Sequence, residues 1–127
     1  MSDTNRALLV VAHGSRREAS NEEVRALSEL IGKKCGERYK LVKTAFLELA
    51  EPSIPNGIEE CIKAGACEVV VMPYFLSAGR HVAIDIPQEV VPKQQQYPDI
   101  TIRIAPYLGA ADGIAELMLQ MSEKDNG

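Results

Sequence analysis

Two short apolar runs constrain the fold of this chain more than any other feature. Residues 6–12 (Arg-Ala-Leu-Leu-Val-Val-Ala) and 68–74 (Glu-Val-Val-Val-Met-Pro-Tyr) have the length of strands and show no alternation of polar and apolar positions. Such runs are typical of parallel strands that helices cover on both faces. Pro73 has no N–H to donate to a neighbouring strand, so the second run is expected to end there.

Segments with helical spacing separate these runs from two less apolar ones. A Ser20–Glu23 capping box is expected to begin the first helix. The other expected elements are strands at 39–47 and 100–105, and helices from Pro52 or Pro55 to 64, from 82 to 96 with interruptions at Pro87 and Pro92, and from 111 to 121. Strands that alternate with helices predict right-handed crossovers and a parallel sheet. We therefore expect a single α/β domain over residues 1–127, with an open four-stranded sheet in the flavodoxin-like order 2-1-3-4 and a frayed tail at 122–127.

The composition excludes several classes of function. The 127 residues carry a net charge of −4, with no Trp and two Phe, which argues against a nucleic-acid surface. The apolar runs are too short to span a membrane, and the polar first residues lack the pattern of a signal peptide, so a cytoplasmic protein is expected. The three cysteines form no C-x-x-C pair and are expected to be reduced thiols.

The two histidines of the chain follow the two most apolar strands. His13 comes directly after residues 6–12, and His81 closes the loop after residues 68–74. In the order 2-1-3-4 the strand order reverses between these strands, and ligands bind beyond the carboxyl ends of the strands at such a point. A lone histidine at a strand end commonly serves only as a hydrogen-bonding residue. The joint placement of two favours a shared functional role.

Charged and hydroxyl side chains flank both histidines. Glu48 and Glu51 follow the second expected strand, where a carboxylate could steer a cation or accept a proton, or could equally be a solvated acid at a helix start. The residues next to the histidines are Ser15, Arg16 and Arg17 on one side, and Ser77, Gly79 and Arg80 on the other. Guanidinium groups hold carboxylates well, so this cluster suggests an anionic small molecule, although exposed arginines without a ligand are equally common.

Three stretches together resemble the small form of the CbiX family, the sirohydrochlorin chelatases. They are residues 8–16 (Leu-Leu-Val-Val-Ala-His-Gly-Ser-Arg), 46–55 with Glu48 and Glu51, and 71–87 with the Pro-x-x-Leu-x-x-Gly-x-His pattern and Asp-Ile-Pro. The resemblance covers about residues 7–120. It implies a parallel chelatase fold and a homodimer with facing crevices, because longer members contain two such units in one chain.

The resemblance also implies roles for particular residues. His13 aligns with a metal-binding proton acceptor and His81 with a second metal ligand. The tetrapyrrole is expected to contact Ser15 and Arg16 and a segment of the second loop that comprises Leu76, Ser77, Ala78, Gly79 and Arg80. Glu48 is expected to take part in catalysis and Glu51 in substrate binding, while which of the two approaches the metal is left open.

The implied reaction inserts a divalent metal into a sirohydrochlorin-type tetrapyrrole on the way to cobalamin, sirohaem or coenzyme F430. Co²⁺ is expected first, with Ni²⁺ and Fe²⁺ as alternatives, and the metal is a substrate, so no organic cofactor is implied. A neutral imidazole can both bind such borderline ions and accept a proton. One rival is a non-catalytic metal or tetrapyrrole carrier that uses the same histidines. Another is an Arg-His-Gly phosphatase, which is disfavoured because Ala12 stands where that arginine would be.

Overall fold

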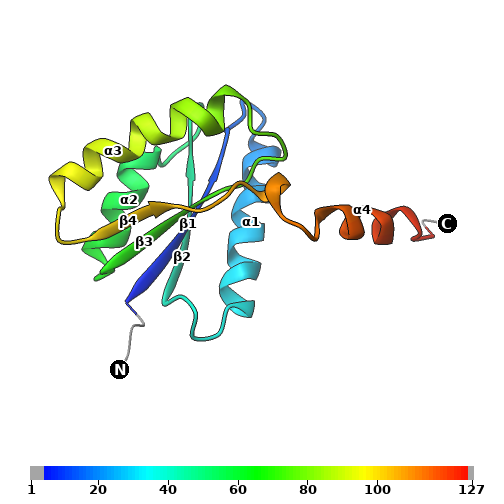
Figure 1. The fold of residues 1–127 in the computed structure, drawn as a ribbon, viewed down its shortest axis with the longest axis horizontal. Coiled ribbons are helices and arrows are strands. Elements are labelled where there is room, and N and C mark those ends of the chain that lie inside the picture. Colours follow the sequence, from blue (N-terminus) through cyan, green and yellow to red (C-terminus); the bar gives the residue numbers. More distant parts are fainter. Residues whose placement is uncertain (1–4, 126–127) are drawn as a thin grey trace.

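A parallel four-stranded sheet forms the centre of the molecule (Figure 1). The computed structural model describes residues 5–125. The strands are β1 (Arg6–Ala12), β2 (Leu41–Phe46), β3 (Glu68–Pro73) and β4 (Thr101–Ile104). Their order is β2-β1-β3-β4, and each pair of neighbours is parallel. The predicted fold class and strand order are therefore confirmed.

The two most apolar strands occupy the middle of the sheet, as their composition predicts. Ala7 of β1 pairs with Leu41 of β2 on one side and with Val69 of β3 on the other. Leu9 and Val69 are fully buried, whereas the first four residues of β2 at the sheet edge are only partly buried. Burial on both faces explains why β1 and β3 lack alternation.

Helices cover both faces of the sheet, giving three layers. The helices are α1 (Glu18–Lys34), α2 (Ile54–Lys63), α3 (Ile86–Gln96) and α4 (Ile114–Ser122), with a π-helical turn η1 (His81–Asp85) and a 3₁₀ turn η2 (Leu108–Ala110). Figure 1 shows α2 and α3 on one side of the sheet and α1 on the other. Leu9 and Val11 pack with α2 and α3, and Leu8 and Val10 face α1, so alternate residues of β1 serve two cores.

The start of α1 differs from the sequence prediction. The helix begins at Glu18 rather than after Ser20, and the predicted Ser20–Glu23 capping box is wrong. Asn21 is 2% exposed, and its side-chain amide accepts from the Ser15 backbone N–H at 3.0 Å and donates to the Ser15 carbonyl at 2.8 Å. The turn before the helix is thus closed by a side chain inside the helix. By contrast, α2 begins with a Ser53 cap, whose Oγ accepts from the backbone N–H of Asn56.

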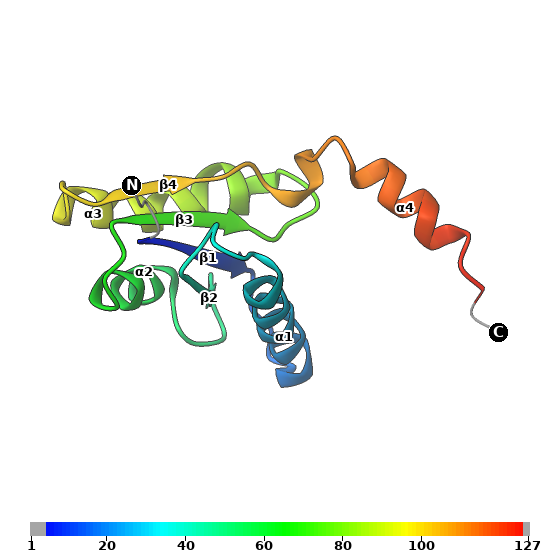
Figure 2. The same ribbon diagram turned by 90° about the horizontal axis from the view of Figure 1, so that it is seen from below.

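The last helix, α4, projects away from the sheet (Figures 1 and 2). It packs chiefly against η2 and has no buried residue. Leu117, Met118, Leu119 and Met121 are all more than half exposed. The expected tail at 122–127 begins inside this helix at Ser122, and residues 126–127 lie outside the described part of the chain.

Two further expectations concern the cysteines and the membrane. Cys35, Cys61 and Cys67 are all free thiols, and burial raises the pKa of Cys61 to about 11. Between residues 5 and 125 there is no helix that combines the length and apolar character needed to cross a bilayer.

Candidate metal centre at the carboxyl edge of the sheet

The two histidines lie side by side at the carboxyl edge of the sheet, as predicted. His13 follows β1, and His81 opens η1 after the loop that leaves β3. Their ring centroids are 4.4 Å apart, and the rings are tilted by 51°. Because β1 and β3 are hydrogen-bonded neighbours, the two segments that carry the histidines leave the sheet side by side.

A carboxylate contacts the ring of His13. The Oε2 atom of Glu48 lies 2.6 Å from Nε2 of His13, and the two side chains are 56% and 44% exposed. The loop after β2 runs beside the end of β1, since Leu47 N–H donates to the Ala12 carbonyl and Glu48 N–H donates to the His13 carbonyl. These backbone bonds carry Glu48 to the histidine.

Gly14 makes this approach of the two loops possible. Its φ is +97°, and a Cβ atom there would lie 1.7 Å from the carbonyl oxygen of Glu48. A side chain at position 14 would therefore force the loops apart. The His-Gly sequence has a structural meaning that the motif alone does not reveal.

A second carboxylate contacts His81. The Oδ2 atom of Asp85 lies 3.0 Å from Nδ1 of His81, one turn away within the π-helical turn η1. Arg80 adds an ion pair, with Nε 3.8 Å from Oδ1 of Asp85, but its side chain is 76% exposed and such pairs contribute little. No role for Asp85 was predicted from the sequence. Its spacing of four residues from His81 would have indicated the contact only if the expected helix had begun at His81 rather than at residue 82.

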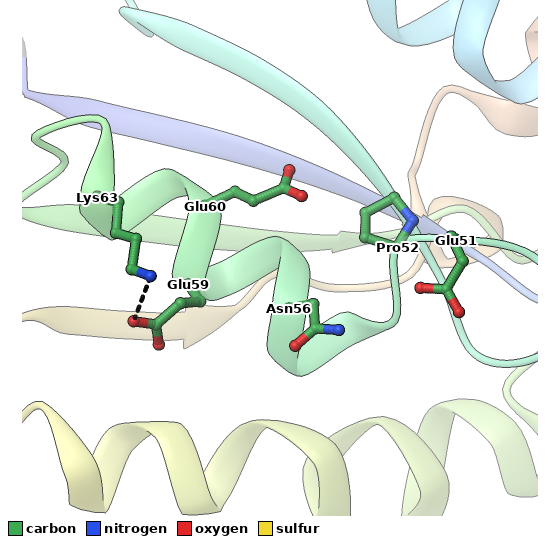
Figure 3. Close-up of a pocket in the computed structure, with 6 residues that line it drawn as sticks. All are labelled: Glu51, Pro52, Asn56, Glu59, Glu60 and Lys63. Carbon is green, nitrogen blue, oxygen red and sulfur yellow. Dashed lines mark ion pairs between the residues drawn. The ribbon is translucent and has the colours of Figure 1, made fainter.

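Glu51 lies elsewhere. It lines an open hollow of about 410 Å³, shown in Figure 3, together with Pro52, Asn56, Glu59, Glu60 and Lys63. The backbone carbonyl of Glu51 accepts from Nη2 of Arg25 at 3.2 Å. Of the two candidate carboxylates, Glu48 is the one whose side chain contacts a histidine.

Apart from Glu51, the expected substrate-binding residues are close to the two histidines in the sequence. Ser15 is engaged in the turn before α1, where its Oγ accepts from the backbone N–H of Arg17. Arg16 and Arg17 are exposed. The segment Leu76, Ser77, Ala78, Gly79 and Arg80 is exposed throughout.

This exposed loop is braced at its start. The Gly109 N–H donates to the Phe75 carbonyl at 3.0 Å, and a Cβ at Gly109 would lie 1.9 Å from the Leu76 carbonyl oxygen. Leu76 is itself 71% exposed, and Tyr74 and Ile84 are 40% and 42% exposed. Exposed apolar side chains therefore flank His81 in the sequence on both sides.

The site offers few ligands to a metal ion. Within residues 5–125, no three His, Cys, Asp or Glu side chains are grouped as a metal cage. The arrangement is instead a pair of imidazoles with one carboxylate on each. Two imidazoles leave coordination positions for water or another ligand, which suits the transfer of an ion better than its storage.

The chain is similar in sequence to proteins that are named as sirohydrochlorin chelatases. It is 38% identical over 102 residues to the chloroplastic sirohydrochlorin ferrochelatase of Arabidopsis thaliana, covering 80% of this chain and 44% of that protein. It is 42% identical over 82 residues to the sirohydrochlorin cobaltochelatase of Methanococcus maripaludis, covering 65% of this chain and 56% of that protein. The chain thus spans about half the length of the curated relatives it matches.

Solved structures share the same fold. The sirohydrochlorin chelatase SirB of Bacillus subtilis subspecies spizizenii, in complex with cobalt, superposes with a TM-score of 0.80 at 31% identity, covering 93% of this chain and 50% of that one. A CbiX protein of Marinobacter aquaeolei VT8, described under cobalamin (vitamin B12) biosynthesis, gives a TM-score of 0.78 at 25% identity and covers 93% and 94%. The CbiX family profile matches residues 7–124. The chain therefore belongs to the CbiX family.

Proposed function

We propose that this protein inserts a divalent metal ion into sirohydrochlorin. The observation that carries the proposal is the contact between His13 and His81, with Glu48 on one ring and Asp85 on the other. Co²⁺ is the metal expected first, with Fe²⁺ and Ni²⁺ as alternatives. Related proteins are named for cobalt and for iron insertion, which supports a tetrapyrrole chelatase without selecting the metal.

In the proposed reaction His13 and Glu48 handle a proton. Insertion of a metal requires that two protons leave the pyrrole nitrogens, so a base must stand near the ion. The imidazole of His13 and the carboxylate of Glu48 are 2.6 Å apart and partly exposed, so one proton can be shared between them and passed on to water. His81 binds the incoming ion through Nε2, the ring nitrogen that Asp85 does not contact.

The exposed surroundings of the histidines suit a large anionic macrocycle. Sirohydrochlorin carries several carboxylates around a flat apolar ring. Arg16 and Arg17 are exposed and can reach such carboxylates. Arg80 is also exposed and can exchange its 3.8 Å ion pair with Asp85 for a substrate carboxylate, while the exposed side chain of Leu76 can lie against the ring. Ser15, Ser77, Ala78 and Gly79 stay in the proposed binding surface, and the role of Glu51 in substrate binding stays a prediction, since Glu51 lines a separate hollow.

We also propose that residues 1–127 form one chelatase unit and that two copies form a homodimer. The related ferrochelatase is about twice as long as the matched region, as expected if two units are joined in one chain. The apolar residues of α4 are exposed in the single copy. In the proposed homodimer a second copy of the chain buries these α4 residues.

A turnover assay tests the proposed function. Sirohydrochlorin is mixed under anaerobic conditions with excess Co²⁺, Fe²⁺ or Ni²⁺, and its absorbance is followed with and without protein. We expect many equivalents of product per protein, and at least about a 100-fold loss of rate in His13→Ala and His81→Ala, which should still fold because both side chains are partly exposed. A reaction that stops at one equivalent would identify a carrier, and equal rates with and without protein would contradict the proposal.

A further inference from the structure

Asp85 and Glu48 contact different nitrogens of their histidine rings. In His81 the carboxylate lies against Nδ1, at 3.0 Å, whereas in His13 it lies against Nε2. The side chain of Asp85 is 28% exposed and that of His81 is 42% exposed. The contact is therefore partly shielded from water.

A carboxylate on Nδ1 determines which nitrogen can bind a metal. In a neutral imidazole one nitrogen carries the hydrogen and the other carries the lone pair, and an ionised carboxylate can only accept. Asp85 therefore favours the form of His81 with hydrogen on Nδ1. The lone pair is then on Nε2, at the far side of the ring from Asp85.

The backbone of η1 holds this pair against the core. The N–H of Ile86 donates to the His81 carbonyl, which is the five-residue bond of a π-helix, and Ile86 itself is fully buried. Within this turn the Asp85 carboxylate lies beside the His81 ring. Asp85 sits at the start of α3, but its side chain accepts no hydrogen bond from the first turn of that helix. Its short contact is with the histidine.

We propose that Asp85 is a positioning residue for the metal ligand His81, fixing its ring orientation and its Nδ1–H form so that Nε2 faces the incoming ion. The proposal rests on the proposed function, because that function makes His81 a ligand. Carboxylates that orient a ligating histidine in this way typically change metal affinity by about 10- to 100-fold when they are removed.

The test uses the full chain and two substitutions of graded effect. Asp85→Asn keeps an acceptor oxygen of similar shape without the charge, and Asp85→Ala removes the acceptor. The matched control is Glu89→Gln, which removes one negative charge four residues further along, in the first turn of α3. For each protein, Co²⁺ affinity is measured by calorimetry without tetrapyrrole, and the hydrogen position on His81 is read from long-range ¹H–¹⁵N spectra of the metal-free protein.

We expect His81 to carry its hydrogen on Nδ1 in the unsubstituted protein. Asp85→Asn should weaken Co²⁺ binding by about 10-fold and Asp85→Ala by about 100-fold, with a shift of hydrogen to Nε2 in the alanine variant. Glu89→Gln should stay within about twofold. If Asp85→Ala does not fold, the Co²⁺ affinity of the asparagine variant, compared with that of Glu89→Gln, decides the matter.

Three results would overturn the proposal. They are an unchanged hydrogen position in Asp85→Ala, Co²⁺ affinity within twofold of the unsubstituted protein in the Asp85 variants, or an equal loss in Glu89→Gln. Failure of the chelatase assay is a separate result. A protein that binds Co²⁺ through His81 and loses affinity in the Asp85 variants, yet shows no turnover, would refute the proposed function and leave the role of Asp85 intact.

Discussion

At the scale of single residues, the site depends on places where only glycine fits. The carbonyl of Glu48 passes so close to Gly14 that no Cβ can be accommodated, and this closeness brings Glu48 to His13. Gly36 also has a positive φ, of +61°, but an added Cβ there meets nothing within 4 Å. Substitution of Gly36 therefore changes stability through backbone conformation alone, whereas substitution of Gly14 adds a steric clash.

We predict that Gly14→Ala loses more stability and more Co²⁺ affinity than Gly36→Ala. Both substitutions place a side chain at positive φ, which costs about 1–2 kcal/mol. Gly14→Ala must in addition displace the Glu48 carbonyl and move Glu48 away from His13. Urea denaturation and calorimetry would measure the two effects. Equal affinities for Co²⁺ in both variants would show that the loop contact does not matter for the site.

The two histidines of the site could be predicted from the sequence, whereas their contacts with carboxylates could not. The positions of His13 and His81 followed from one rule, that ligand sites lie where the strand order of a parallel sheet reverses. The choice between Glu48 and Glu51 did not follow, because it depends on how the loop after β2 hydrogen-bonds to the end of β1. Asp85 was missed because a helix expected from residue 82 left its partner His81 in the preceding loop.

At the scale of elements, helix ends and turns account for the differences between expectation and structure. The four strands and four helices were expected in the right order, because apolar burial decides them. The start of α1 and the π-helical turn η1 were not, because both depend on a few hydrogen bonds that leave no periodic pattern. A side chain such as Asn21 can replace an expected cap from inside the helix.

We predict that Asn21→Ala destabilises the protein and Ser20→Ala does not. Asn21 is 2% exposed and bonds to both the N–H and the carbonyl of Ser15, so its removal leaves these groups unsatisfied and should cost about 1–3 kcal/mol. Ser20 lies within the first turn of α1 and caps nothing, so its loss should stay within about 0.5 kcal/mol. Urea denaturation compares the two. A larger cost for Ser20→Ala would restore the capping box.

A second contact between elements should control stability in acid. Glu59 of α2 accepts from Nζ of Lys93 and from the hydroxyl of Tyr97, each at 2.6 Å. The hydrogen bond from Lys93, followed by that from Tyr97, lowers the pKa of Glu59 from its ordinary value of 4.5. A lowered pKa in the folded state stabilises the protein above the unfolded pKa, and that stabilisation is lost as pH falls through the folded one.

We therefore predict that Glu59→Gln flattens the loss of stability below about pH 4.5. Urea denaturation at intervals from neutral pH into acid would measure the change. Glu60→Gln on the same helix is the control, because the nearest cation to its exposed side chain is Lys43 at 3.7 Å. If both variants keep the acid dependence of the unsubstituted protein, the contact between α2 and α3 does not govern it.

At the scale of the whole molecule, α4 stands apart because its apolar side chains are not buried within the single copy. The sequence predicted a closing helix with an apolar side, and such a helix normally packs on the sheet. In the structure it extends away from the body instead (Figure 2). Its exposed Leu117 and Met118 suit an interface, which sequence periodicity could indicate but could not place.

We predict that the protein is a dimer at micromolar concentration and that Leu117→Glu with Met118→Glu makes it monomeric. The double substitution puts two charges on a helix surface that water already reaches, so the single unit should keep its fold. Multi-angle light scattering gives the mass, and circular dichroism checks the fold. Glu116→Gln, on the same helix, is the control. A monomeric unsubstituted protein would refute the proposed homodimer.

One consequence concerns stoichiometry. His13 and His81 come from a single chain, so each copy holds its own histidine pair. In the proposed homodimer two equivalent pairs would face one macrocycle, which has room for one ion. The dimer would be symmetric, but each cycle inserts a single ion. One of the two histidine pairs would therefore bind no metal in that cycle. A fused two-unit chain escapes this constraint, because its halves are free to diverge.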